Sequence, residues 1–163
     1  MLARDDRLWL SRSWTTRPRR HGEPEDAYRF VDRDTFNERV EAGGFLEWAP
    51  VLDHLYGTPW PEPPPGSDVL LEIDVQGARQ VLETHPDAVC ILLLAPSVEA
   101  QRARLRARGD SEEHLKKRIE LGQSEEGEGR ALATHVVVND NLDSAVDQLS
   151  AIIDAARSAQ TRP

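Results

Sequence analysis

The sequence predicts an α/β fold in which helices cover both faces of a parallel sheet. Four runs are apolar and rich in β-branched residues, without the alternation of a half-exposed strand, and helical stretches separate them. Continuous apolar strands separated by helices are typical of a parallel sheet that is buried on both sides. The chain has 163 residues, which is enough for one domain with its own core.

The expected elements follow these runs in chain order. Strands are expected over four of them: Leu8 to Ser13, Val69 to Asp74, Val89 to Ala95 and His135 to Asn139. Helices are expected over four others: Val75 to Thr84, Ser97 to Arg108, Glu112 to about Glu126, and Leu142 to Ala159. We expect Ser97 to cap its helix, Gly109 to end it, and Asp140 or Asn141 to cap the last helix.

Residues 22–66 break this rhythm and are expected to form a small inserted lobe. A short helix is expected from Asp34 to Ala42, with strand pieces around residues 28–30 and 45–48. The proline-rich segment 61–65 cannot form a helix or a central strand, because proline lacks the backbone donor that both need. We therefore expect that segment to be an extended connector.

The composition excludes several classes of function. The net charge of −9 counts against a general binder of nucleic acid or membrane surfaces. The longest apolar run, Val89 to Ala95, is too short to cross a bilayer, and residues 1–6 lack the apolar core of a signal peptide. Cys90 is the only cysteine, so we expect a small core side chain there. We expect a cytoplasmic protein, and a monomer as the default.

Positive charge is concentrated in residues 1–20 and 102–118, which together carry +8 against −17 for the remainder. A solvated helix face explains the second stretch equally well. The first stretch differs, because hydroxyls interleave with its arginines. The planar guanidinium fork matches phosphate oxygens bidentately, so Arg17 and Arg20, three apart in a turn, indicate a site for a phosphate monoester.

Asp74 ends one of the predicted strands. Ligands of open α/β sheets lie beyond the carboxyl ends of the strands, so this carboxylate is well placed to meet a ligand or Mg²⁺. Aspartate at such a junction is also a common helix N-cap. The residue alone does not decide between these two roles.

Eight short motifs occur in one order from about Leu8 to Ile153: Ser-x-Ser-x-Thr-Thr-Arg, Gly-Glu, Phe-x-Glu-x-Ala, Tyr-Gly-Thr, Ile-Asp-x-Gln-Gly, Pro-Ser, Arg-Leu-x-x-Arg-Gly and Val-Asn-Asp. Each motif alone is weak, but the ordered set resembles the guanylate kinase family, whose members transfer a phosphoryl group from ATP to GMP. The resemblance implies a P-loop kinase-type parallel sheet, with residues 22–66 as a GMP-binding lobe and 102–122 as a lid.

The resemblance also implies how the guanine base is recognised. Glu47 matches the carboxylate that accepts hydrogen bonds from N1 and N2 of guanine, where adenine has no equivalent pair of donors. Three other residues match positions around the base: Ser13, Thr58 and Asp74. A site with such buried partners strongly rejects a base that leaves them unpaired.

Four residues match those that hold the GMP phosphate in the family: Arg17, Arg20, Tyr28 and Tyr56. The proline of this motif is displaced in this sequence, so Arg20 is chosen by spacing and Arg19 is a rival. For the two tyrosines, simple packing within the lobe is the alternative interpretation.

On the ATP side, the resemblance implies that three arginines close over the phosphates: Arg104, Arg108 and Arg118, the last with Lys117 beside it. Asn139 matches a residue near the adenine of ATP, although turn capping explains it about as well. Positioned cations and Mg²⁺, the expected cofactor, supply most of the catalysis in phosphoryl transfer.

The sequence departs from the family in one large respect, because it contains no Gly-x-x-x-x-Gly-Lys-Ser/Thr loop for the ATP phosphates. In the family this loop follows a central strand that precedes the Leu8 strand, so that strand is also expected to be absent. Our preferred interpretation is that Met1 is an internal methionine of a longer reading frame. The alternatives are a loop-less domain that binds GMP or phosphopeptides without catalysis, and a kinase for another small molecule.

Overall fold

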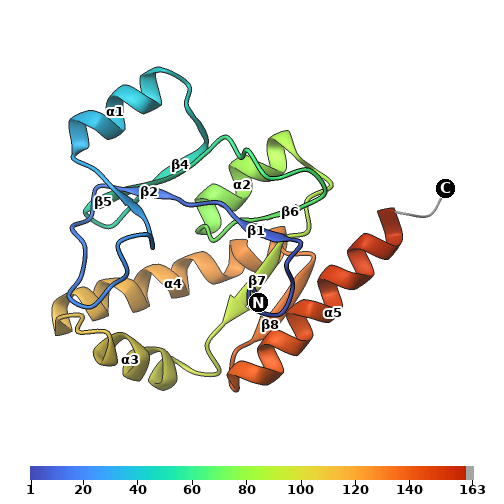
Figure 1. Cartoon of the computed structure of the whole chain (residues 1–163). Coiled ribbons are helices and arrows are strands. Elements are labelled where there is room, and N and C mark those ends of the chain that lie inside the picture. Colours follow the sequence, from blue (N-terminus) through green and yellow to red (C-terminus); the bar gives the residue numbers. More distant parts are fainter. Residues whose placement is uncertain (161–163) are drawn as a thin grey trace. The chain divides into compact units, whose positions relative to one another are not determined.

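Residues 2–87 form the first of two units in the computed structural model, which describes residues 1–160 (Figure 1). Two short strands, β1 (Leu8–Leu10) and β6 (Asp68–Leu70), pair in parallel with Trp9 opposite Val69. A second sheet has the strand order β3-β2-β5-β4 and contains β2 (Trp14–Thr15), β3 (Arg29–Phe30), β4 (Phe45–Val51) and β5 (His54–Pro59). Strand β2 runs parallel to β3 and antiparallel to β5, so this sheet is mixed.

Two helices complete the first unit. Helix α1 (Arg33–Glu41) begins after Asp32, whose carboxylate accepts a hydrogen bond from the Thr35 backbone N–H at 2.7 Å. Its Phe36 is fully buried and packs with Phe45 and Leu55 of the mixed sheet. Helix α2 (Val75–Thr84) contacts β4. The mixed sheet therefore has α1 packed on its apolar core and α2 against its edge strand.

The second unit comprises residues 88–160 together with Met1. Strands β7 (Ile91–Leu94) and β8 (His135–Val138) pair in parallel, with Leu93 opposite Val137. Three helices accompany them: α3 (Val98–Ala107), α4 (Glu112–Leu132) and α5 (Leu142–Gln160). Leu105, Leu115 and Ile119 form the apolar contact that holds α3 against α4.

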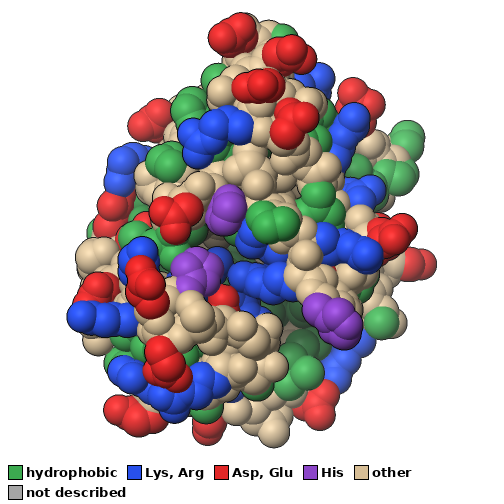
Figure 2. Space-filling view, turned by 90° about the vertical axis from the view of Figure 1, so that its left-hand side faces the viewer, with side chains coloured by type: hydrophobic (Ala, Val, Ile, Leu, Met, Phe, Trp, Pro, Cys, Tyr) green, Lys and Arg blue, Asp and Glu red, His purple; other side chains and the backbone are tan. Residues whose placement is uncertain are grey.

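Charged side chains of both signs are interspersed over the face drawn in Figure 2. On α4 they pair at helical spacing: Lys117 Nζ lies 2.9 Å from a Glu113 carboxylate oxygen, and Arg130 Nη2 lies 2.8 Å from one of Glu126. Such exposed pairs each add only tenths of a kcal/mol to about 1 kcal/mol. In the part of the chain that the structure describes, no helix has the length and apolar character needed to span a bilayer.

The α/β class is confirmed, as are most of the elements. Ser97 caps α3 by accepting from the Ala100 N–H, Gly109 follows that helix at φ 85°, and Asn141 rather than Asp140 accepts from the Ser144 N–H. The short helix of the lobe lies where it was predicted, shifted by one residue, and segment 61–65 has neither helix nor strand.

Three boundaries were predicted wrongly. The first strand stops at Leu10 and the chain then joins the other sheet at β2, so Leu8 to Ser13 is not one strand. The second predicted strand, Val69 to Asp74, ends at Leu70. Its pairing with the first strand stops there, where the Ser11 N–H donates to the Leu70 carbonyl at 3.0 Å. Helix α4 continues past Glu126 to Leu132 although glycine has low helix propensity, and its Gly129 is buried.

The pairing of the parallel strands fits the expectation of a parallel sheet that lacks its central strand. Within residues 1–160, they occur as two separate pairs, β1 with β6 and β7 with β8. Cys90 lies just before β7 and is half-buried rather than in the core, and burial raises the pKa of its thiol.

Candidate functional site

Glu47 is the most deeply buried carboxylate among the predicted site residues, with 4% of its surface exposed. It belongs to β4, where Phe45, Glu47 and Ala49 are buried while Trp48 is exposed. A β-bulge after Phe45 sets the register so that Glu47 lies opposite Thr58 of β5. Bulges often redirect side chains at functional sites. The alternation of β4 thus places an acidic side chain where a core residue is expected.

The environment of Glu47 disfavours its charge. Burial raises the pKa of its carboxyl group, a hydrogen bond with Thr58 opposes this shift, and the nearby charge of Asp74 adds to it. Ser13 Oγ lies 3.3 Å from Thr58 Oγ1, and Thr58 is 1% exposed. Three of the four residues predicted around the base therefore lie together in one buried polar cluster.

Asp74, the fourth, lies at the start of α2. Its Oδ1 accepts from the Gly77 N–H at 2.8 Å, and its Oδ2 accepts from Gln76 Nε2 at 3.2 Å. The helix-cap role is thus confirmed, and it leaves Asp74 near Glu47. A Cβ built on Gly77 would lie 2.5 Å from Glu47 Oε2 and 3.3 Å from Asp74 Oδ1, so both carboxylates approach this glycine.

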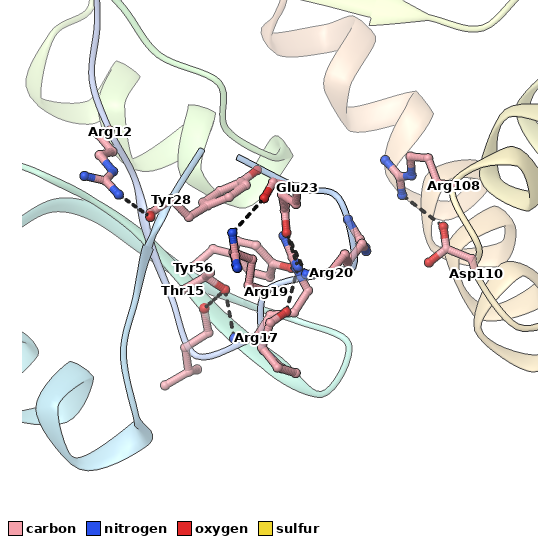
Figure 3. Close-up of polar contacts among 12 residues, drawn as sticks. Arg12, Thr15, Arg17, Arg19, Arg20, Glu23, Tyr28, Tyr56, Arg108 and Asp110 are labelled. Carbon is pink, nitrogen blue, oxygen red and sulfur yellow. Dashed lines mark hydrogen bonds and ion pairs between the residues drawn. The ribbon is translucent and has the colours of Figure 1, made fainter. Parts of the chain in front are cut away.

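Arg17 is the centre of the predicted phosphate site and is 5% exposed. It makes a bidentate ion pair with Glu23, with Nη1 to Oε2 at 2.9 Å and Nη2 to Oε1 at 2.7 Å (Figure 3). Its Nε donates to the Tyr56 hydroxyl at 3.2 Å and Nη1 also donates to the Pro18 carbonyl at 2.8 Å. The hydrogen bond with Glu23 raises the pKa of Arg17 and lowers that of Glu23 to about 2.

The two predicted tyrosines lie beside this arginine. Arg17 Cζ is 5.5 Å from the centre of the Tyr28 ring, and the Tyr28 and Tyr56 rings meet edge to face at 6.0 Å. Burial raises the pKa of Tyr28. Both tyrosines pack in the lobe, and the Tyr56 hydroxyl also carries a polar contact to the guanidinium, so packing alone does not account for Tyr56.

The choice between Arg19 and Arg20 has a geometric side. The Arg20 backbone N–H donates to Glu23 Oε2 at 2.9 Å, and its side chain is half-buried. Arg19 is exposed, donates to the Glu23 backbone carbonyl at 3.1 Å and lies 3.6 Å from the Glu25 carboxylate. Glu23 therefore organises this turn, although sequence reasoning gave it no role. The Gly-Glu motif was the available signal.

The predicted ATP-side residues belong to the second unit. Arg104 Nη2 donates to the Asn139 carbonyl oxygen at 2.7 Å, so these two lie together. Arg108 Nη2 lies 3.1 Å from Oδ2 of Asp110 (Figure 3). The Asp110 side chain is only 3% exposed and also contacts His114 Nδ1 at 3.1 Å. Arg118 is half-buried, and its Nε has no hydrogen-bond partner within the described residues.

Comparison with known proteins agrees with the motif order. The family model for guanylate kinase matches residues 3–156. The chain is 47% identical to a guanylate kinase of Thermus thermophilus over 96% of this chain and 73% of the relative. It is 42% identical to that of Symbiobacterium thermophilum, over 99% and 79%. The chain belongs to the guanylate kinase family.

The structural comparison points the same way. The crystal structure of guanylate kinase from Anaplasma phagocytophilum superposes with a TM-score of 0.71 at 29% identity, over 96% of this chain and 78% of that one. Membership of the guanylate kinase family gives the chain the function of a phosphotransferase. The resemblance drawn from the eight motifs is therefore confirmed.

The Arg17–Glu23 pair predicts how stability depends on pH. The folded-state pKa of Glu23 is about 2, below its ordinary 4.5, so the pair stabilises the fold above about pH 4.5 and this stabilisation is lost as pH falls towards 2. We expect wild type to lose about 1–2 kcal/mol more than Glu23→Gln between pH 6 and pH 2.5, after allowance for solvent screening. Urea unfolding at a series of pH values measures this difference. Equal losses in the two proteins would contradict the prediction.

Proposed function

We propose that residues 2–87 bind GMP, with Glu47 accepting hydrogen bonds from N1 and N2 of guanine. The observation that carries this proposal is the buried cluster of Glu47, Thr58 and Ser13, with Asp74 nearby. The cost of burying the Glu47 charge is offset when the N1–H and the exocyclic N2 amine of guanine both donate to it, because charge-assisted hydrogen bonds are about twice as strong as neutral ones. Adenine presents no such pair of donors, so it leaves the carboxylate unsatisfied.

The hydroxyls refine this preference. Ser13 and Thr58 can each donate as well as accept, so they suit the O6 and N7 acceptors of guanine. Their 3.3 Å separation lets one hydroxyl orient the other. Asp74, held by the first turn of α2, is the second acidic group for the exocyclic amine.

We place the GMP phosphate at Arg17, Arg20, Tyr28 and Tyr56. Four of the five N–H groups of Arg17 are engaged by Glu23, Tyr56 and Pro18, which holds its fork in one orientation. A phosphate then meets the fifth N–H, the Tyr56 hydroxyl and the Arg20 side chain. Glu23 belongs to this proposal as the group that orients Arg17.

The second unit supplies the groups for ATP. We propose that Arg104, Arg108 and Arg118 neutralise the phosphates and that Asn139 lies near the adenine. No group of three potential metal ligands occurs within residues 1–160. Mg²⁺ commonly binds through substrate phosphates, water and one or two carboxylates, so we propose that it arrives with ATP and balances the charge of the transferred group.

A calorimetric titration tests GMP recognition. We expect the 163-residue chain to bind GMP at least about 100-fold tighter than AMP, because AMP leaves buried partners unpaired. Binding of a phosphopeptide without GMP would instead support a peptide-binding domain, and binding of neither would favour a kinase for another small molecule.

A coupled assay for ADP release with ATP, Mg²⁺ and GMP tests transfer. Since the 163 residues hold no glycine-rich loop with a lysine, we expect turnover only when such a segment is joined to them. Turnover by the 163 residues alone would contradict this expectation.

We also propose that the protein is a cytoplasmic monomer, which size-exclusion chromatography and cell fractionation can test.

A further inference from the structure

We propose that Gly77 is a positioning residue for base recognition: its lack of a side chain creates the space in which Glu47 and Asp74 converge. This inference rests on the GMP site proposed above and adds a specificity-determining residue to it. Gly77 touches no substrate atom in this proposal, and acts only through Glu47 and Asp74.

The backbone gives no other reason for glycine at this position. Gly77 lies in the first turn of α2 and its φ is not in the left-handed region, unlike that of Gly109 at 85°. Alanine is the better helix former at an ordinary helical position. Alanine is excluded by the lack of space at this position, because a Cβ on residue 77 would lie 2.5 Å from Glu47 Oε2 and 3.0 Å from Glu47 Cδ.

The backbone of Glu47 has little freedom to move away from such a methyl group. Its backbone is held in the β4–β5 ladder opposite Thr58, and only 4% of its surface is exposed. The atoms that the methyl group would meet are nevertheless the end of a flexible side chain, not backbone. We therefore infer that the carboxylate would rotate away and weaken its hydrogen bond with Thr58, while the fold persists.

Two other glycines provide contrast. A Cβ on Gly57 would lie 3.0 Å from Trp48 Cβ and 3.1 Å from both the Phe36 and Phe45 rings, so that glycine serves packing. A Cβ on Gly127, within α4, would meet nothing within 4 Å. Gly127→Ala is thus a matched control, because it is the same substitution in a helix and no residue beyond its two chain neighbours brings a carboxylate within 4 Å of the added Cβ.

The asymmetry of the contacts identifies which property should change. At Gly77, the N–H holds Asp74 at 2.8 Å while the Cα face admits Glu47. The substitution closes the second contact, whereas the first needs only a small shift, because the added Cβ would lie 3.3 Å from Asp74 Oδ1 and 2.5 Å from Glu47 Oε2. The affinity for the N1 and N2 donors of guanine should therefore fall, whereas the stability of helix α2 should rise.

The experiment compares Gly77→Ala with Gly127→Ala and wild type. Calorimetry with GMP and with IMP, which lacks the N2 amine, gives the selectivity, and thermal unfolding gives the stability. We expect Gly77→Ala to bind GMP at least about tenfold more weakly and to lose most of the preference for GMP over IMP, with a melting temperature no lower than wild type. Gly127→Ala should keep both affinities.

A second variant tests the mechanism. Glu47→Asp shortens the side chain by one methylene, so in the double variant Gly77→Ala with Glu47→Asp the methyl group has room. We expect the second substitution to weaken GMP binding less in the Gly77→Ala background than in wild type.

Each outcome has one meaning. Unchanged GMP affinity and selectivity in Gly77→Ala would overturn the inference, and so would a variant that fails to fold, because Gly77 would then serve packing as Gly57 does. Additive losses in the double variant would also overturn it. Failure of the GMP site itself is distinguishable, since wild type would then show no preference for GMP over AMP.

Discussion

Replacing Glu47 with glutamine is expected to abolish the preference for GMP while leaving the protein at least as stable as wild type. Glutamine has nearly the same shape, but it presents one acceptor and an NH₂ group where guanine offers two donors. We expect GMP affinity to fall at least about 100-fold, since two hydrogen bonds to a charged group are lost or opposed.

Stability should move in the other direction. Burial raises the pKa of Glu47, so ionisation of this group at neutral pH costs free energy in the folded state, and stability contributed by the protonated form is lost as pH rises through the folded-state pKa. Glutamine removes that cost. The free energy of unfolding of Glu47→Gln at pH 7 should therefore equal or exceed that of wild type.

Calorimetry with GMP and urea unfolding measure the two effects. Glu62→Gln, the same change at an exposed residue of the proline-rich segment, is the matched control and should alter neither. Loss of stability in Glu47→Gln would show that the ionised carboxylate supports the fold, and full GMP affinity would remove Glu47 from the base site.

The second large effect is expected at Arg17, where stability and phosphate binding can be separated. Arg17→Ala leaves the Glu23 carboxylate without its bidentate partner. This pair is mostly buried, since the side chain of Arg17 is 6% exposed and that of Glu23 is 15% exposed. Removing one partner of such a pair is strongly destabilising, and we expect a loss of about 3 kcal/mol. GMP affinity should fall at least about tenfold, because the arginine that meets the phosphate is gone.

A double variant separates the two roles. Arg17→Ala combined with Glu23→Ala leaves no uncompensated charge, so we expect much of the lost stability to return. GMP binding should stay weak, because the phosphate still lacks its arginine, whereas guanosine, which has no phosphate, should bind all variants alike. Arg33→Ala is the control, since that side chain is exposed at the start of α1 and has no place in the proposed site. Recovery of GMP binding in the double variant would remove Arg17 from the phosphate site.

Local chemistry explains why much of the fold could be predicted. Ser97 and Gly109 bound α3 as expected, because capping hydroxyls and left-handed glycines act within a few residues of sequence. The apolar runs at β7 and β8 were recognisable because strands of a covered parallel sheet are apolar along their whole length. The expected burial on both faces is wrong for the described residues, since Leu93, Val136 and Val138 are exposed. Strand ends were less predictable. Leu10 ends β1 only because the chain leaves its partner there for the mixed sheet.

The candidate site divides in the same way. Residue types and motif order alone pointed to Glu47, Thr58 and Arg17, since carboxylates, hydroxyls and guanidiniums have fixed hydrogen-bonding chemistry. The sequence could not show that Glu23 engages the Arg17 fork, or that Gly77 makes room for Glu47. The first contact depends on the conformation of the turn between Arg17 and Glu23, and the second depends on how helix α2 packs against strand β4. Sequence determined which groups are available and the family they indicate, and tertiary structure decided which of these groups meet, because only packing sets distances between separate elements.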